Sequence, residues 1–455
     1  MDESRSLLQE LSVYLDYLYE AVRTGNNKAI QAAKVFVLDC MGCIIVGSND
    51  KATNIAKAYT EDYGGVGTST VFGAKSFQTD AGNAALVNSI AAHTRDFDDI
   101  GRSLDGHPGS IILPTILAVG EKLNCSGMDF LGAYIVGVEA ACILGKCLYK
   151  KDYPQGWEST CTIGVFGSAA ASAKLMGLKN EKLTNALAIA ANLSAGLRAT
   201  YGTMTTDLIV GRAASNGIFC AEMAARGFGS NAFMLEGHSG FIELCTSGLD
   251  EKLLREEIQR KEPEVVSPGL VMKLYPSCRG THNAIDAVLS IKDKHNICKQ
   301  DVENIECICQ KSALVNDLYP YPETKLQGKI SMRYCVALCV LYGGVQMEDF
   351  IGGNIEDKDV IDLMQKISLT EDDTYFDDAI CGTEVIIKCV GGEIRRCKVD
   401  YAKGEPQNPP NEEERRQKFT ACAQYAYSEA GINNIIKETN SLEKIDSIRH
   451  WISIF

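Results

Sequence analysis

The chain has 455 residues, 45% of them hydrophobic, and this length predicts two or three domains, of which we expect two. A net charge of −14 and the lack of Lys/Arg blocks disfavour nucleic acids and anionic membranes as partners, because such surfaces bind clustered cations. The 18 cysteines lie scattered through apolar stretches, a pattern typical of buried thiols in a reducing cytoplasm.

The first residues, MDESRSLLQE, are acidic, and no uncharged apolar run reaches the length of about 18 residues that a membrane helix needs. We therefore expect a cytoplasmic protein without a membrane partner. Cys40 and Cys43 form a single CxxC, but neither a second pair nor partner histidines follow at zinc spacing. We expect no metal and no cofactor.

From Ser6 to about Gly248 the sequence predicts helices, because apolar residues recur at intervals of three and four, as in LLQELSVYLDYLYEAV. Several of these helices, such as NAALVNSIAAH, are rich in alanine and apolar on nearly every side. Helices of that kind are buried by other helices. This part of the chain therefore predicts a large all-helical domain.

The pattern changes after about Pro268. A helical stretch THNAIDAVLSIKDKH precedes the strand-like VENIECICQ, and TEVIIKCVGGEIRRCKVDY alternates on both sides of Gly391-Gly392 like a hairpin. After GEPQNPP, Asn411 and Glu414 predict a helix N-cap. We expect a mainly α fold: residues 1–267 and 408–455 form the helical domain, and residues 268–407 form an inserted α+β lid.

The segment HTRDFDDIGRSLDGHPGS, residues 93 to 110, carries the predicted chemistry. The helix that begins near Ala81 should end near Thr94, which places Asp96, Asp98 and Asp99 at its negative end. Acids at that end predict either nearby cations, with Arg95 as one neighbour in a structural ion-pair cluster, or a carboxylate with a raised pKa that acts as an acid or base.

Two histidines have suitable settings for proton transfer. His107 lies in the loop before the apolar helix IILPTILAVGE, which Ser110 is expected to cap, with Pro114 in its first turn. His282 stands at the start of the helix that opens the second domain, where an anion would be stabilised. A histidine from each domain, with Asp96 between them, predicts a cleft that closes on a small molecule.

The sequence has no nucleophile elbow, no phosphate-binding GxxxxGK[ST], no dinucleotide fingerprint and no HExxH. These absences disfavour covalent and cofactor chemistry. The reaction class that remains is the abstraction or delivery of a proton beside a carboxylate. In such a reaction, cations and helix N-termini stabilise the developing charge.

In six segments the chain resembles the MmgE/PrpD family: AAHTRDFDDI, HPGSIILPTILAVGE, GWESTCTIGVFGSAAASAKLMGL, GTMTTDLIVGRAASNG, YPSCRGTHNAID and KISMRYCVALCVLYGG. The family includes 2-methylcitrate dehydratase, cis-aconitate decarboxylase and iminodisuccinate epimerase. The resemblance implies a helical domain made from both chain ends, a smaller α+β lid, a homodimer and no cofactor. It also implies that Asp96, His107 and His282 are the catalytic residues.

The same motifs depart from the family pattern at several substrate-binding positions. Thr206 replaces the family lysine, Ile209 replaces a histidine three residues later, and Glu158 stands where histidine is common. Three arginines are new in these motifs: Arg102, Arg279 and Arg333. We expect their planar guanidinium groups to bind substrate carboxylates.

The resemblance and the retained residues predict a lyase or isomerase that acts on a small carboxylic acid by dehydration, decarboxylation or epimerisation. The alternative is a non-catalytic paralogue that binds carboxylates or assists assembly. The substrate and the direction of the reaction stay open at this point.

Overall fold

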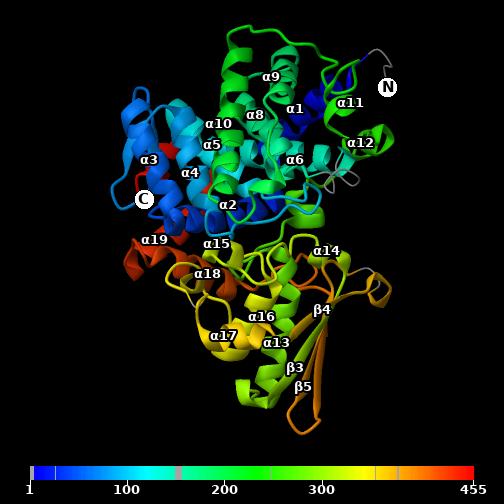
Figure 1. Ribbon diagram of the computed structural model, residues 1–455. Coiled ribbons are helices and arrows are strands. Elements are labelled where there is room, and N and C mark those ends of the chain that lie inside the picture. Colours follow the sequence, from blue (N-terminus) through cyan, green and yellow to red (C-terminus); the bar gives the residue numbers. More distant parts are fainter. Residues whose placement is uncertain (1–4, 26, 149–155, 247, 354, 377–378) are drawn as a thin grey trace.

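In the computed structural model the chain is mainly helical, and the structure describes residues 5–25, 27–148, 156–246, 248–353, 355–376 and 379–455. Figure 1 shows two parts, one above the other, with most of the sheet in the lower one. The helices before residue 260 are α1 (Leu7–Gly25), α2 (Asn27–Gly47), α3 (Lys51–Tyr63), α4 (Ala81–His93), α5 (Pro108–Leu123), α6 (Gly127–Leu148), α7 (Ser159–Thr162), α8 (Gly164–Leu175), α9 (Glu181–Asn192), α10 (Thr205–Ala225), α11 (Phe241–Cys245) and α12 (Glu251–Glu257).

The larger hydrophobic core gathers buried residues from both ends of the chain, from Leu7 through Met272 and again from Phe419 through Ile452. Alanine and glycine on α4, α8 and α10 allow close helix packing. A Cβ at Gly217 would clash with Ser168, and one at Gly211 would meet the backbone of Leu86. The small residues of the sequence therefore serve tight contact between buried helices, as their composition predicted.

This part is not purely helical, which corrects the prediction of an all-helical domain. Strands β1 (Ser69–Val71) and β2 (Phe77–Thr79) form a short antiparallel pair. Glu121 accepts hydrogen bonds from the backbone N–H and the hydroxyl of Thr70, at 2.6 and 2.8 Å. Three residues per strand give too little alternation to be recognised in the sequence.

The smaller core lies between helices and a four-stranded sheet in the order β4-β3-β5-β6. Strand β3 runs parallel to β4 and antiparallel to β5, and the hairpin predicted around Gly391-Gly392 joins β5 to β6. The elements are α13 (His282–His295), β3 (Val302–Cys309), α14 (Lys311–Leu314), α15 (Lys325–Gly328), α16 (Met332–Tyr342), α17 (Lys358–Met364), β4 (Ile367–Glu371), β5 (Thr383–Cys389) and β6 (Ile394–Val399).

The chain then returns to the larger core through α18 (Glu412–Ala423), α19 (Glu429–Asn440) and α20 (Ile448–Ile452). The predicted cap of α18 is confirmed, since Asn411 and Glu414 form a reciprocal capping box. The C-terminal helices lie beside α2 and α3 in Figure 1. The domain boundaries at 267/268 and 407/408, and a lid that moves, stay predictions.

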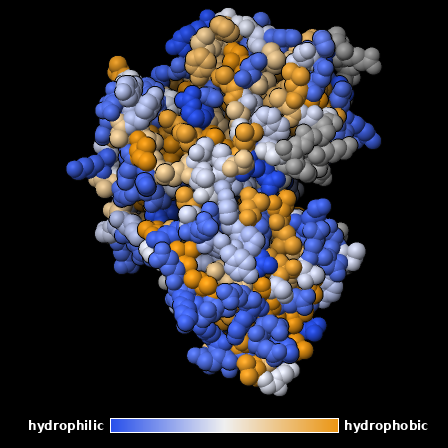
Figure 2. Space-filling model, in the orientation of Figure 1, coloured by the Kyte–Doolittle hydropathy of each residue, from blue (hydrophilic) through white to orange (hydrophobic). Residues whose placement is uncertain are grey.

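Helices α2 and α6 have the length and apolar composition of a membrane span, but 78% and 94% of their apolar windows are buried inside the protein. Figure 2 shows hydrophilic side chains over much of both parts, interleaved with apolar patches. Among the 18 cysteines none forms a disulfide and only Cys298 is exposed. Burial raises the pKa of Cys40 and Cys43 well above the usual thiol range, which makes both thiols unreactive.

Candidate active site

A cavity of about 250 Å³ lies between the two parts of the molecule. Both parts supply its wall, because His93, His107 and Asp207 come from the larger part, and Arg279, Lys329 and Glu405 come from later in the chain. Its size and its convergent polar groups are typical of a small-molecule site.

Helix α4 leads into this cavity and ends where the sequence predicts, at His93 with Thr94 as its C-cap. Three buried lysines from later in the chain donate hydrogen bonds to carbonyls in the following turn. Lys329 Nζ donates to Thr94, Lys273 Nζ to Asp96 at 2.7 Å and Lys418 Nζ to Phe97 at 2.8 Å. The cations expected at the negative end of α4 therefore arrive from distant segments.

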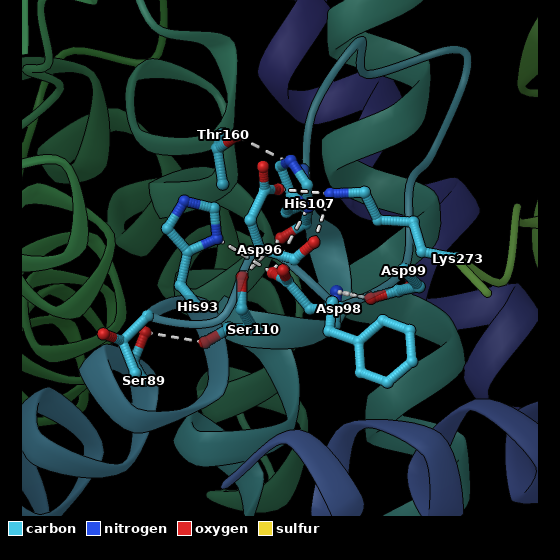
Figure 3. A network of polar contacts seen from close by, with 12 residues as sticks. Ser89, His93, Asp96, Asp98, Asp99, His107, Ser110, Thr160 and Lys273 are labelled. Carbon is cyan, nitrogen blue, oxygen red and sulfur yellow. Dashed lines mark hydrogen bonds and ion pairs between the residues drawn. The ribbon is translucent and has the colours of Figure 1, made fainter. Parts of the chain in front are cut away.

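Two histidines share one carboxylate at the centre of the site (Figure 3). Nδ1 of His93 lies 3.0 Å from Oδ2 of Asp98, and Nδ1 of His107 lies 3.3 Å from the same oxygen. The imidazole rings meet edge to face with centroids 4.8 Å apart. Asp98 is fully buried, whereas both rings line the cavity.

The shared carboxylate sets the protonation of the group. Burial opposes the charge on Asp98, but the adjacent His107 and His93 hold the pKa of that carboxyl well below its usual range. Burial likewise opposes the charge on His93, yet Asp98 raises the pKa of His93 to about 9. His93 is therefore an imidazolium at neutral pH, and it is held in place by its counterion.

Asp99 differs from Asp98 although both are buried. Burial, followed by the charges of Asp98 and Asp39, raises the pKa of Asp99 well above its usual range, so this carboxyl is protonated. Its Oδ1 accepts from the N–H of Gly109 at 3.0 Å, and a Cβ at Gly109 would clash with that oxygen. The glycine in the HPGS sequence is therefore required by this contact.

The start of α5 corrects one prediction. The helix begins at Pro108 with His107 at its N-cap position, so Ser110 lies inside the helix and does not cap it. The hydroxyl of Ser110 donates to the carbonyl of His107 at 3.0 Å. Pro114 is an interior residue, not part of the first turn. This start brings His107 from the expected loop to the tip of a buried helix.

Asp96 lines the cavity and adopts a left-handed backbone conformation with a φ of 50°. Its carboxylate pairs with the fully buried Lys273. The pair lies beside the histidine group in Figure 3, where Lys273 approaches from another segment of the chain. Asp96 is therefore anchored at the cavity wall by its ion pair, and its catalytic role stays a prediction.

Arg102 and Arg279 both reach the cavity, as predicted, but neither is free. Each pairs with Glu405, whose side chain is fully buried between them. Arg279 also donates to Asn283 at 2.9 Å. Burial and the neighbouring Arg279 lower the pKa of Arg102 to about 10. The two guanidinium groups and the one carboxylate leave one net positive charge on this side of the cavity.

Glu158 and Thr206 also line the cavity. Glu158 caps α7 through the N–H of Cys161, and its other oxygen accepts from Tyr201 at 3.2 Å. The neighbouring Asp105 is open to the cavity, and burial together with the charge of Glu158 raises its pKa to about 6. Thr206 donates to the Thr200 carbonyl at 2.8 Å, so it lends the cavity no charge.

Two predicted site residues are not brought to the cavity wall. His282 is buried behind the wall, with Nε2 3.2 Å from the Ser277 carbonyl, and burial and Arg279 hold its pKa well below the usual range. Arg333 lies with its guanidinium over Tyr321 and 3.9 Å from Asp317. Neither residue is part of the cavity wall, and their expected roles at the site stay predictions.

Sequence reasoning missed several residues that line or support the cavity. His93 stands in the quoted segment and could have been found there, because it lies five residues before Asp98. Lys273, Lys329 and Glu405 carry no local signal, since isolated charged residues in loops are usually solvated. Burial alone distinguishes these three from ordinary surface charges.

Comparisons with known proteins identify the family of the chain. The MmgE/PrpD N-terminal domain model matches residues 16–253, and the MmgE/PrpD C-terminal domain model matches residues 275–444. The chain belongs to the MmgE/PrpD family. It is 27% identical to the cis-aconitate decarboxylase of Homo sapiens over 92% of this chain and 89% of that protein. It is 26% identical to the cis-aconitate decarboxylase of Aspergillus terreus over 85% of this chain and 83% of that protein.

The atoms of the histidine group lie within 4.8 Å of one another, a spacing that a metal site also has. However, both Nδ1 atoms are turned to one carboxylate oxygen, which is the arrangement of protonated ring nitrogens beside their counterion. The expectation of no metal and no cofactor stays a prediction.

Proposed function

We propose that the protein is a lyase that acts on a small carboxylic acid by acid-base proton transfer, without a cofactor. The observation that carries this proposal is the histidine pair on Asp98, which lines the same cavity as the paired arginines. The names of its relatives make decarboxylation the first reaction to test. Dehydration and epimerisation need the same proton transfer beside a carboxylate.

The substrate carboxylate is expected near Arg102 and Arg279, because guanidinium groups bind carboxylates through paired hydrogen bonds. Glu405 already neutralises half of that charge, so the arginines have one net positive charge to offer. On the opposite side, Glu158 and Asp105 repel a further carboxylate. A substrate with one strongly held carboxylate and a neutral or cationic group near Glu158 fits this charge distribution best.

The reaction follows from the polar groups. In a decarboxylation the carbon–carbon bond to the leaving carboxylate breaks, carbon dioxide departs, and the electron pair stays on the neighbouring carbon. That carbon then takes a proton from an acid at the cavity wall. Arg102, Arg279 and Lys329 supply positive charge near the developing anion, which lowers the barrier.

The assembly and location of the protein belong to the same proposal. We infer that residues 268–407 act as an inserted lid, and that the protein is a cytoplasmic homodimer. Contacts across the cavity, such as Lys329 with Thr94, support closure of the smaller part on the larger one. Size determination in solution tests the dimer.

The experiment is a substrate panel. Purified protein is incubated with cis-aconitate, 2-methylcitrate and several amino and hydroxy dicarboxylates in heavy water. Carbon dioxide release, water elimination and deuterium incorporation are then measured. Turnover of one acid supports the lyase. Binding of an acid without turnover or exchange contradicts it and favours the non-catalytic paralogue.

The departures from the family pattern allow a sharper test. Restoring the family groups in a Glu158→His, Thr206→Lys double variant is expected to raise cis-aconitate turnover above that of the natural chain, because both changes add positive charge. An Asp446→Asn variant, altered at an exposed acid, is the control. Equal cis-aconitate turnover in the double variant and the natural chain would show that these positions do not select the substrate.

A further inference from the structure

We propose that His93 is a second catalytic histidine, which delivers a proton to the substrate while His107 accepts one. The inference rests on the proposed function and assigns its acid and its base to two residues. It arises from the geometry of the shared carboxylate, in which two imidazoles compete for one counterion.

Asp98 offers Oδ2 to Nδ1 of both histidines. Nδ1 of His93 hydrogen-bonds to this oxygen and so carries a hydrogen. Nδ1 of His107 lies 3.3 Å from the same oxygen, at ion-pair distance, and we place its hydrogen on this nitrogen too. In each ring Nε2 is then the nitrogen that can gain or lose a proton. No described residue bonds to Nε2 of either ring. Because both rings line the cavity, these nitrogens are available to a molecule bound there.

The pair holds one positive charge, since two imidazolium rings with centroids 4.8 Å apart would repel each other across a single carboxylate. The surroundings decide which ring holds it. His93 lies closer to Asp98, is 8% exposed, and feels the further negative charges of Asp207 and Asp96. His93 is therefore the ring that carries the charge, and we assign the role of proton acceptor to His107.

Cations from other elements also lie near this group, but they do not take over Asp98 as a partner. Lys329 lies near Asp207 and Asp96, and Lys418 is paired with Asp39 behind Asp98. Arg95 is paired with Asp50. Lys418 and Arg95 are engaged by their own carboxylates and Lys329 donates to the Thr94 carbonyl, so Asp98 remains the counterion of the histidine pair.

The protons balance in each reaction. In an elimination, the C–H bond beside the carboxylate breaks, Nε2 of His107 takes the proton, and Nε2 of His93 gives its proton to the departing hydroxyl, which leaves as water. In a decarboxylation, Nε2 of His93 protonates the carbon that carbon dioxide has left. A proton from solvent then restores the imidazolium.

The test compares His93→Gln with His107→Gln and with His238→Gln, a control whose side chain is 92% exposed. We expect His93→Gln to lower kcat at least about 100-fold. The wild-type rate should fall as the pH rises through about 9, and the residual rate of His93→Gln should lack this fall. A His93→Gln variant with wild-type kcat and the same alkaline limb would overturn the proposal. A variant whose melting temperature falls but whose kcat holds would also overturn it.

Histidine NMR tests the charge separately from turnover. With 13C-labelled histidine, we expect one ring of the wild-type pair to stay protonated well above pH 7, and to return to ordinary titration in Asp98→Asn. If the natural chain turns over no acid, the lyase proposal fails while this measurement still decides the charge. If both rings are neutral at pH 7, the role of His93 fails even where turnover is found.

Discussion

The two walls of the cavity are assembled in different ways. The histidine wall comes from one continuous segment between His93 and Gly109, in which α4, a loop and the start of α5 bring the side chains together. The arginine wall joins Arg102, from the same segment, to Arg279 and Glu405, which come from distant parts of the chain. The first wall can be recognised from a short sequence, whereas the charge of the second depends on the complete fold.

This difference explains why the two arginines offer less free positive charge in the structure than the sequence predicts. From the sequence, Arg102 and Arg279 are two cations that replace a lost lysine. In the structure they are bound to an internal carboxylate that no local pattern connects with them. A test of each wall therefore needs a different variant.

The largest effect is expected from Asp98→Asn in the histidine wall. The variant removes the shared counterion, so His93 loses its charge and both rings lose their orientation. We expect kcat to fall about 10²- to 10⁴-fold, the range of general acid-base catalysis. The exposed Asp446→Asn serves as control, and steady-state kinetics at neutral pH measures the change. Undiminished kcat in Asp98→Asn would place the chemistry elsewhere.

A second test removes the counterion of the arginine wall. Glu405→Gln leaves two largely buried guanidinium groups, 13% and 11% exposed, without a carboxylate, which should lower the free energy of unfolding by about 3 kcal/mol. The same change should tighten the binding of small dicarboxylates roughly tenfold, equal to about 1.4 kcal/mol. Denaturant melts and calorimetric titration measure both effects, with the exposed Glu393→Gln as control. Weaker binding would show that Glu405 assists the ligand and does not compete with it.

The pH dependence of the free energy of unfolding tests the charge of His93 in the histidine wall. Because the pKa of His93 is raised to about 9 in the folded state, its contribution is complete below about pH 6.5 and is lost as the pH rises through 9. We expect about 2 kcal/mol of stability to disappear over this window in the natural chain. In His93→Gln the loss should be smaller, as shown by melting temperatures between pH 6 and 10. Parallel curves for the two proteins would contradict the assignment.

The smallest effect is expected at Arg333, outside both walls. Arg333→Ala removes the contact over Tyr321 and the bond to the Ile367 carbonyl, at a cost of about 1 kcal/mol in stability. KM should change by less than about twofold, because the side chain does not reach the cavity. Arg279→Ala provides the comparison within the arginine wall. A large increase in KM for Arg333→Ala would restore its predicted role in binding.

The sequence by itself determined the elements with a local physical cause. The alanine-rich helix α4, its end at His93, the capping box at Asn411 and the hairpin at Gly391-Gly392 all depend on residues within a few positions of one another. The acid-base segment could be found for the same reason. The six quoted motifs also identified the family that the domain models show.

The tertiary structure alone decided the charges of the site. Whether a carboxyl or a guanidinium is free depends on burial and on partners from distant segments, which explains why Asp98 and Asp99 differ although they are neighbours. Lys273, Lys329 and Lys418 neutralise the end of α4 from three separate places. Glu405 occupies the arginines in the same way. Electrostatic energy depends on distance in space, and the folded chain sets that distance.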